Sequence, residues 1–307
     1  MSSSPRVTES SVRTRTMASL QRNLNRTQQA QDQISSGKQL NRPSDSPTGT
    51  VTALQLRGEV RANRKYSANA DDAVGRLGVV QDNLQSSVEL LTVARNLTLE
   101  AKSTGGQGTP EANRARAEQL GQIKANLVQF ANSKYLDRPV FGGSTPDAEA
   151  YDSSGKYAGE AAGQTFRAIG PNAKVRVDVR GPEVFGPDQA ADGTDNPTQM
   201  FRVLDNIIDA MKSGDVDALD TGLQNLDKAS DLVKSTLSDV GARYNRVTQM
   251  KQSAEDRLMS VSSQLSDIED VDLPKAIMEL QLQQTSYQAA LAATAKVIQP
   301  SLIDFLR

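Results

Sequence analysis

The side chains that most often carry catalysis and bind metals are missing from this chain. Its 307 residues include no cysteine and no histidine. A thiolate nucleophile, an imidazole base, a disulfide and the nitrogen and sulfur ligands of the usual zinc site are therefore all excluded. Chemistry could rest only on carboxylates, hydroxyls and lysines.

Two segments have the composition of a ligand site without its spacing. Gly37-Lys38 resembles part of a phosphate-binding loop, but the full Gly-x4-Gly-Lys-Ser/Thr spacing is absent and no strand precedes it. Asp267, Glu269, Asp270 and Asp272 could in principle hold a cation, although charges at the end of a helix are normally solvated. We therefore predict no catalytic residue, no metal site and no cofactor, and we interpret the chain as a non-enzyme.

Charge is distributed unevenly along the chain. Residues 1–65 contain eleven basic and four acidic side chains, whereas residues 255–307 contain eight acidic and four basic ones. A basic region can bind nucleic acid, but this one has few aromatic residues to stack on bases. The acidic carboxyl-terminal region of the same chain is the alternative partner.

No targeting segment is predicted. The first residues lack the apolar core of a cleaved secretory signal, and no run approaches the ~20 apolar residues that span a bilayer. We expect no membrane insertion, and any export must use a route without a cleaved signal.

The strongest periodicity is a heptad pattern between residues 223 and 268. Apolar residues occupy twelve of fourteen positions spaced alternately by three and four, and no proline interrupts them. This pattern is typical of a long helix buried along one stripe against other helices. The positions are Leu223, Leu226, Ser230, Val233, Leu237, Val240, Tyr244, Val247, Lys251, Ala254, Leu258, Val261, Leu265 and Ile268.

Three further helices are predicted as neighbours of this long helix. One runs from about Val51 to Lys102, a second starts at Pro110, and a third surrounds Met200 to Met211. Each has apolar residues at helical spacing. We therefore predict a mainly α protein, an elongated antiparallel helical bundle or coiled coil formed by both chain ends.

Both ends of the chain repeat the helical spacing with thinner apolar stripes, diluted by Thr and Gln. A pair of such helices would be marginal alone in water. We expect the ends to be disordered in the monomer and to become helical when neighbouring subunits cover them. The predicted assembly contacts are Met17, Leu20, Leu24, Ile34, Ile277, Leu280, Tyr287, Leu291, Ile298, Leu302, Ile303, Phe305 and Leu306.

Residues 136–197 differ in composition from the rest, because they hold nine of the 21 glycines and six of the twelve prolines. The segment from Val175 to Arg180 alternates valine with charged residues, which predicts a strand with one wet face. We interpret this region as a small β-rich insertion domain. Deletion of residues 145–195 is expected to leave the bundle folded.

A rigid connector is predicted between the first two helices. Glycine can adopt the left-handed conformation that ends a helix, and proline favours the first turn of the next. Ser46 is well placed to cap that second helix. The connector residues are Gly37, Asn41, Pro43, Asp45 and Pro47.

Short motifs near both ends form a recognisable set. The amino-terminal motifs are Ile34-Ser-Ser-Gly-Lys38, Asn41-Arg-Pro-Ser-Asp45 with Pro47, Leu54-Gln-Leu-Arg57 and Tyr66-x-x-Asn69. The carboxyl-terminal motifs are Asp270-Val-Asp-Leu-Pro, Leu280-Gln-Leu-Gln-Gln284 and Tyr287-Gln-Ala-Ala-Leu291. Together they resemble the bacterial flagellin family. Tyr135-Leu136 running into Phe141-Gly-Gly143 resembles the hook-associated protein 3 branch of that family.

This resemblance implies a structural subunit of the bacterial flagellum. It implies a ring of identical subunits at the hook–filament junction, between hook-associated protein 1 and the flagellin filament. The implied partners are further copies of the chain, hook-associated protein 1, flagellin and an export chaperone at the carboxyl-terminal tail. Export through a type III channel and an extracellular location are implied as well.

The predicted organisation has three parts. Residues 1–44 with 270–307 form the terminal helical pair, residues 45–135 with 198–269 form a helical rod, and residues 136–197 form the insertion. The alternative function close in class is a short filament flagellin. An enzyme within the insertion and a basic coiled-coil DNA binder are the other readings.

Overall fold

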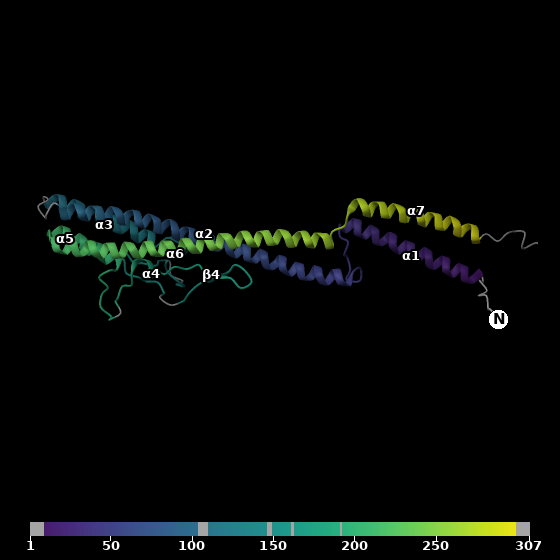
Figure 1. The fold of residues 1–307 in the computed structure, drawn as a ribbon, viewed down its shortest axis with the longest axis horizontal. Coiled ribbons are helices and arrows are strands. Elements are labelled where there is room, and N and C mark those ends of the chain that lie inside the picture. The colour runs from purple at the N-terminus through teal and green to yellow at the C-terminus, as the bar shows by residue number, and fades with distance from the viewer. Residues whose placement is uncertain (1–8, 104–109, 146–148, 161–162, 191, 299–307) are drawn as a thin grey trace, which may run out of the picture. The chain divides into compact units, whose positions relative to one another are not determined.

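The computed structural model describes residues 9–103, 110–145, 149–160, 163–190 and 192–298. This part of the chain is mainly helical and carries two small antiparallel sheets of two strands each (Figure 1). None of the helices within it combines the length and the apolar character needed to cross a membrane. The mainly α fold class predicted from the periodicities is confirmed.

The chain divides into two compact units, and the first combines residues 1–61 with 258–307. It contains α1 (Glu9–Ser36) and α7 (Leu273–Ile298), which pack against each other. The start of α2 (Pro47–Ser103) and the end of α6 (Val216–Glu269) complete it.

The α2–α6 part of this unit has a small core of its own. The core consists of Leu56, Val60 and Val261, with Leu258, Leu265 and Ile268 packed against them. Since few apolar side chains are buried here, hydrophobic stabilisation of this unit is modest.

The second unit, residues 62–257, holds the larger core. Its helices are the remainder of α2 and α6 together with α3 (Pro110–Ala131) and α5 (Met200–Ser213). All three predicted neighbouring helices are therefore confirmed, although α2 begins at Pro47, before the expected Val51.

The heptad pattern of α6 is confirmed along its whole length, because all fourteen positions are buried or half-buried. Val233, Val240 and Val247 have no exposed surface. The two polar members, Ser230 and Lys251, are half-buried at the same stripe. A period of 3.5 residues thus places one continuous face of α6 against the rest of the fold.

The insertion contains less regular structure than its alternation predicts. Its strands are β1 (Lys134–Tyr135), β2 (Arg138–Pro139), β3 (Phe166–Ala168) and β4 (Lys174–Arg176). Strands β1 and β2 form one hairpin and β3 and β4 another. A short helix, α4 (Gly181–Phe185), follows, and the remaining described residues form loops and turns.

The prediction that one face of residues 175–180 lies in water is wrong. Val175, Val177 and Val179 are buried as predicted, but Asp178 is only 1% exposed and Arg176 is half-buried. The Asp178 carboxylate accepts a hydrogen bond from the Thr165 amide at 2.6 Å and others from the Arg176 guanidinium. Ion pairing therefore buries a charged face that the alternation alone would leave in water.

An aromatic cluster joins the insertion to the helices. Tyr151 and Phe185 lie in the insertion, and each has its ring centroid within 5.5 Å of the ring of Phe201 in α5. Phe141 packs on Phe185 at 5.4 Å. These rings belong to the same buried cluster as the helical seams. The insertion therefore shares its core with the bundle, which argues against the expectation that residues 145–195 can be removed harmlessly.

Candidate assembly surface

The predicted contact residues of α1 divide between two environments. Leu20 and Ile34 are half-buried against α7, and Ala30 between them is only 8% exposed. Met17 and Leu24 lie on the outside, 65% and 41% exposed. The face of α1 that meets α7 is therefore narrow, as its diluted stripe predicts.

Helix α7 divides in the same way. Leu280 and Tyr287 are half-buried and share a face with the buried Ala276. Ile277 and Leu291 are 45% and 43% exposed. Of the predicted residues, Ile298 ends α7, but its side chain, like Leu302, Ile303, Phe305 and Leu306, lies outside the described part of the chain.

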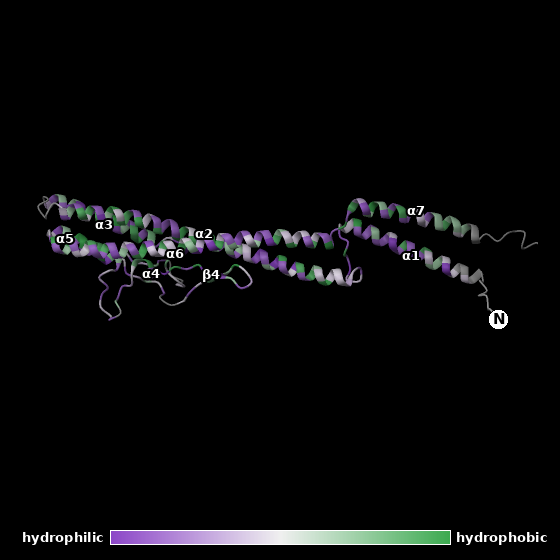
Figure 2. Ribbon diagram, in the orientation of Figure 1, coloured by the Kyte–Doolittle hydropathy of each residue, from purple (hydrophilic) through white to green (hydrophobic). Residues whose placement is uncertain are grey.

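Two exposed apolar sets result on α7. Leu273, Ile277 and Leu291, spaced by four and by fourteen residues, lie on one flank of the helix, and we call them the α7 flank. Met278 and Leu282, four residues apart and 64% and 65% exposed, lie farther round and form the α7 outer pair. Figure 2 shows hydrophobic and hydrophilic residues intermixed along α1 and α7. Because contiguous exposed apolar surface marks binding sites, the α7 outer pair and the neighbouring Leu273 and Ile277 make this helix the candidate assembly surface.

The connector between α1 and α2 has the helix-ending and helix-starting chemistry predicted for it. Gly37 adopts the left-handed conformation with a φ of +69° directly after α1. The Ser46 hydroxyl accepts a hydrogen bond from the Gly49 amide at 3.1 Å, and α2 begins at Pro47. Sequence and structure agree closely at both helix ends.

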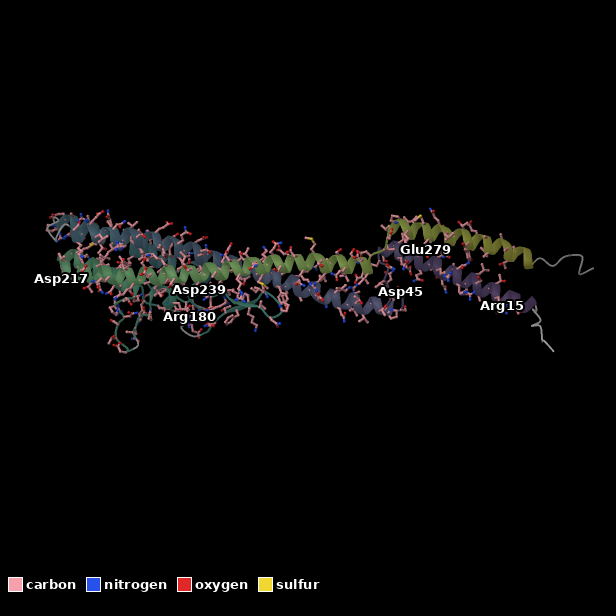
Figure 3. The ribbon with its side chains drawn as sticks, viewed as in Figure 1. Arg15, Asp45, Arg180, Asp217, Asp239 and Glu279 are labelled. Carbon is pink, nitrogen blue, oxygen red and sulfur yellow. The ribbon has the colours of Figure 1, made fainter. Side chains whose placement is uncertain are left out.

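The Asp45 side chain binds backbone amides in the middle of the connector (Figure 3). Its Oδ2 accepts hydrogen bonds from the backbone amides of Asn41 and Arg42, at 3.1 and 2.8 Å. The turn that contains Pro43 lies within this loop. The carboxylate thus holds an otherwise irregular segment in one conformation.

A buried acid ties the connector to the end of α6. The Glu269 carboxylate, whose side chain is 5% exposed, forms ion pairs with Arg57 of α2 at 2.6 Å and Lys38 of the connector at 3.5 Å. Lys38 also binds the Asp270 carboxylate at 2.6 Å. We call these four residues the Glu269 node. Three separate chain segments meet there.

Backbone hydrogen bonds reinforce the Glu269 node. The Gln39 amide donates to the Glu269 carbonyl at 2.7 Å, and the Val271 amide donates to the Gly37 carbonyl at 3.0 Å. Lys38 and Asp270 therefore face each other as an isolated antiparallel bridge. The two segments that lead into α1 and α7 are fastened side by side.

Electrostatics at the node favours the charged forms. The hydrogen bond to Asp270 raises the pKa of Lys38 above its ordinary value of 10.5, with smaller contributions from the nearby acids. The hydrogen bonds from Lys38 and Ser266 lower the pKa of Asp270 below 3.8. The ion pair with Glu269 raises the pKa of Arg57.

The sequence did not point to this node. Lys38 and Arg57 lie in the recognised motifs, but no pattern connected them with an acid more than 200 residues away. Glu269 and Asp270 belong to the acidic group considered for a cation. No grouping of three or more metal-binding side chains occurs in the portion of the chain that the structure describes.

These features define the class of protein. A long helical seam, a pair of terminal helices with exposed apolar sets and a structured connector describe a helical assembly subunit. The bacterial flagellin N-terminal helical region matches residues 7–138, and the bacterial flagellin C-terminal helical region matches residues 223–306. The chain belongs to the bacterial flagellin family, and it is a structural protein of the flagellum.

Individual relatives cover most of the chain. It is 24% identical over 279 residues to the flagellar hook-associated protein 3 of Escherichia coli, covering 85% of this chain and 87% of that relative. It is 23% identical over 294 residues to the flagellin of Bacillus subtilis, covering 92% and 93%. A putative flagellar hook-associated protein from Vibrio parahaemolyticus has a similar fold, with a TM-score of 0.63 at 18% identity over 74% of this chain and all of that one.

Proposed function

We propose that this protein forms a ring of identical subunits at the hook–filament junction, between hook-associated protein 1 and the flagellin filament. The exposed apolar sets of α7 carry the proposal, because five large apolar side chains on a terminal helix need a covering partner. Neighbouring copies in a ring would supply that cover. The similarity to hook-associated protein 3 of E. coli supports the junction as the location.

The subunit reaches this location by export without a cleaved signal. Its carboxyl-terminal tail is held beforehand by an export chaperone, and assembly removes the tail from water. These two statements rest on the family resemblance and on the apolar residues Leu302, Ile303, Phe305 and Leu306.

A short filament flagellin is the second candidate. The flagellin of Bacillus subtilis, which aligns with 92% of this chain, favours it. Assembly order separates the two functions, since a flagellin elongates on its own seeds whereas a junction ring stops. Immunolabelling of isolated flagella should give one band between hook and filament; labelling along the filament would establish the alternative.

The α7 flank can be tested with a matched pair of variants. Ile277→Ser with Leu291→Ser should abolish incorporation into flagella while the thermal unfolding of the monomer stays the same, because both side chains are already exposed. Met259→Ser, which changes a 74% exposed residue of α6, serves as the control and should incorporate normally. Normal motility of the α7 double variant would contradict the proposed role of this surface.

A further inference from the structure

The β1–β2 hairpin has an unusual residue at its tip. Tyr135 pairs with Arg138, so Leu136 and Asp137 form a two-residue turn, and both have positive φ, 48° and 62°. Turns of this type favour Asn and Gly, because a side chain such as leucine costs roughly 1–2 kcal/mol in the left-handed region. Leu136 is nevertheless 75% exposed. A strained leucine with three quarters of its surface exposed gains little from burial in its own fold, which makes the hairpin tip a candidate contact site.

The same unit contains a groove that fits such a side chain. It lies between α5 and the start of α6 and has a volume of about 530 Å³. Its floor is formed by small or apolar residues, and its rim is polar. The lining includes Val203, Ala210, Ala218 and Gly222 on the floor and Asn206, Asp209 and Thr221 on the rim.

The charges around the two surfaces are complementary. The exposed side chains of Lys134 and Arg138 flank Leu136, and the exposed Asp137 lies between Leu136 and Arg138 in the turn. The groove carries Asp209 on its rim and Asp217 beside it at the start of α6, where Figure 3 labels it. The hairpin tip, with two cations and one carboxylate, therefore has a net charge of +1 and faces an acidic rim.

The hairpin cannot reach the groove of its own chain. It follows the end of α3, whereas the turn from α5 to α6 lies at the opposite end of that helix (Figure 1). The 22 residues of α3 separate the two ends by about 33 Å within one compact unit. Only another molecule can bring the two surfaces together.

We propose that Leu136 inserts into the α5–α6 groove of a second copy of this chain, with Arg138 facing Asp209 of that copy. The contact joins two different surfaces, so each subunit can bind one neighbour at the hairpin and another at the groove. Such a heterologous contact closes into rings or continues as a helix. The inference rests on the proposed self-assembly and identifies one of its interfaces.

Cross-linking tests the contact directly, because the chain has no cysteine of its own. Leu136→Cys combined with Thr221→Cys should give, on oxidation of isolated flagella, disulfide-linked dimers and a ladder of larger multimers. Leu136→Cys combined with Ser235→Cys, at an exposed site elsewhere on α6, is the matched control and should give neither. Equal cross-linking of both pairs, or none in the first pair, would overturn the proposal.

A second set of variants distinguishes loss of the intermolecular contact from loss of folding stability. Leu136→Asn places a favoured residue in the turn, so the melting temperature of the monomer should stay constant or rise while incorporation into flagella falls at least tenfold. Arg138→Glu should have the same effect and should be rescued by Asp209→Arg, whereas Arg114→Glu on α3 should assemble normally. Normal assembly of Leu136→Asn would refute this interface. If immunolabelling of wild-type flagella shows no band between hook and filament, the proposed function is refuted instead.

Discussion

Glu269 ends α6 as a buried acid whose partners are two cations from different segments. Arg57 and Lys38 are themselves 49% and 44% exposed, so both can be solvated again if the acid is lost. The cost of removing its charge should therefore fall below the 3–5 kcal/mol typical of a fully buried pair. The backbone bridge next to it reports on the node independently.

Glu269→Gln should weaken the node by about 1–2 kcal/mol, because the amide cannot form either ion pair. Amide hydrogen exchange at Gln39 and Val271, whose hydrogen bonds close the bridge, should accelerate about tenfold or more. Asp267→Asn removes the same charge from an exposed position of the same helix end and is the control. Unchanged exchange in the Gln variant would show that the ion pairs are dispensable.

The node should also respond to pH in a defined window. Since the pKa of Asp270 is lowered in the folded protein, its contribution to stability is present above the ordinary carboxyl pKa and is lost as pH falls through the lowered value. Lys38, whose pKa is raised, contributes fully below its ordinary pKa of 10.5 and loses this contribution as pH rises through the raised value. The protection factor of the Val271 amide, which is the exchange rate of an unfolded chain at the same pH divided by the observed rate, should therefore fall below about pH 4. Asp270→Asn should remove this acid response; a response that persists in the variant would locate it elsewhere.

At the scale of elements, the insertion differs most from its prediction, because it shares a buried core with the helices. Phe185 has 1% exposure and contacts three other rings, Phe141, Tyr151 and Phe201. Phe185→Ala should destabilise residues 62–257 by about 3–5 kcal/mol, because it opens a cavity in a shared core. Tyr151→Phe should be neutral or slightly stabilising, since the buried Tyr151 hydroxyl has no hydrogen-bond partner among the described residues. Chemical denaturation measures both, and a harmless Phe185→Ala would restore the insertion as a separable domain.

Helices and their ends could be predicted from the sequence because both depend on local rules. The heptad of α6, the left-handed Gly37 and the Ser46 cap need only spacing and residue type. The burial of Asp178 could not be predicted in this way, because its carboxylate also accepts a hydrogen bond from the Thr165 amide, thirteen residues earlier in the chain, and such a partner cannot be inferred from the local alternation. The same limit applies to the Glu269 node.

The division of α7 into covered and exposed residues could be predicted only in part. The spacing placed Ile277 and Leu280 in a single stripe. Among the described residues α7 packs mainly against α1, which covers the Leu280 side and leaves Ile277 exposed. A helix with one neighbour must leave the rest of a broad apolar pattern exposed. The sequence therefore placed these residues on one stripe of α7 but could not say which of them face α1.

At the scale of the whole molecule, the size of the two cores predicts how the chain tolerates truncation. Removal of residues 1–36 and 273–307 takes away α1 and α7 but none of the large core in residues 62–257. The truncated protein should remain helical with an unchanged main unfolding transition, and it should fail to enter flagella. Circular dichroism and a complementation assay for motility measure the two outcomes. Loss of the main transition would mean that the terminal helices stabilise the larger unit.

The bridge between residues 37–39 and 269–271 has a mechanical consequence. Helices α1 and α7 run antiparallel from it, so tension applied to the two chain ends loads their contacts one after another, as in opening a zipper. Sequential loading needs little force, whereas the bridge should resist more strongly, because the ion pairs of Glu269 and Asp270 lie close beside its backbone hydrogen bonds. Optical tweezers attached at both termini should record a gradual low-force extension followed by a discrete step at the bridge. Glu269→Gln should move that step to lower force.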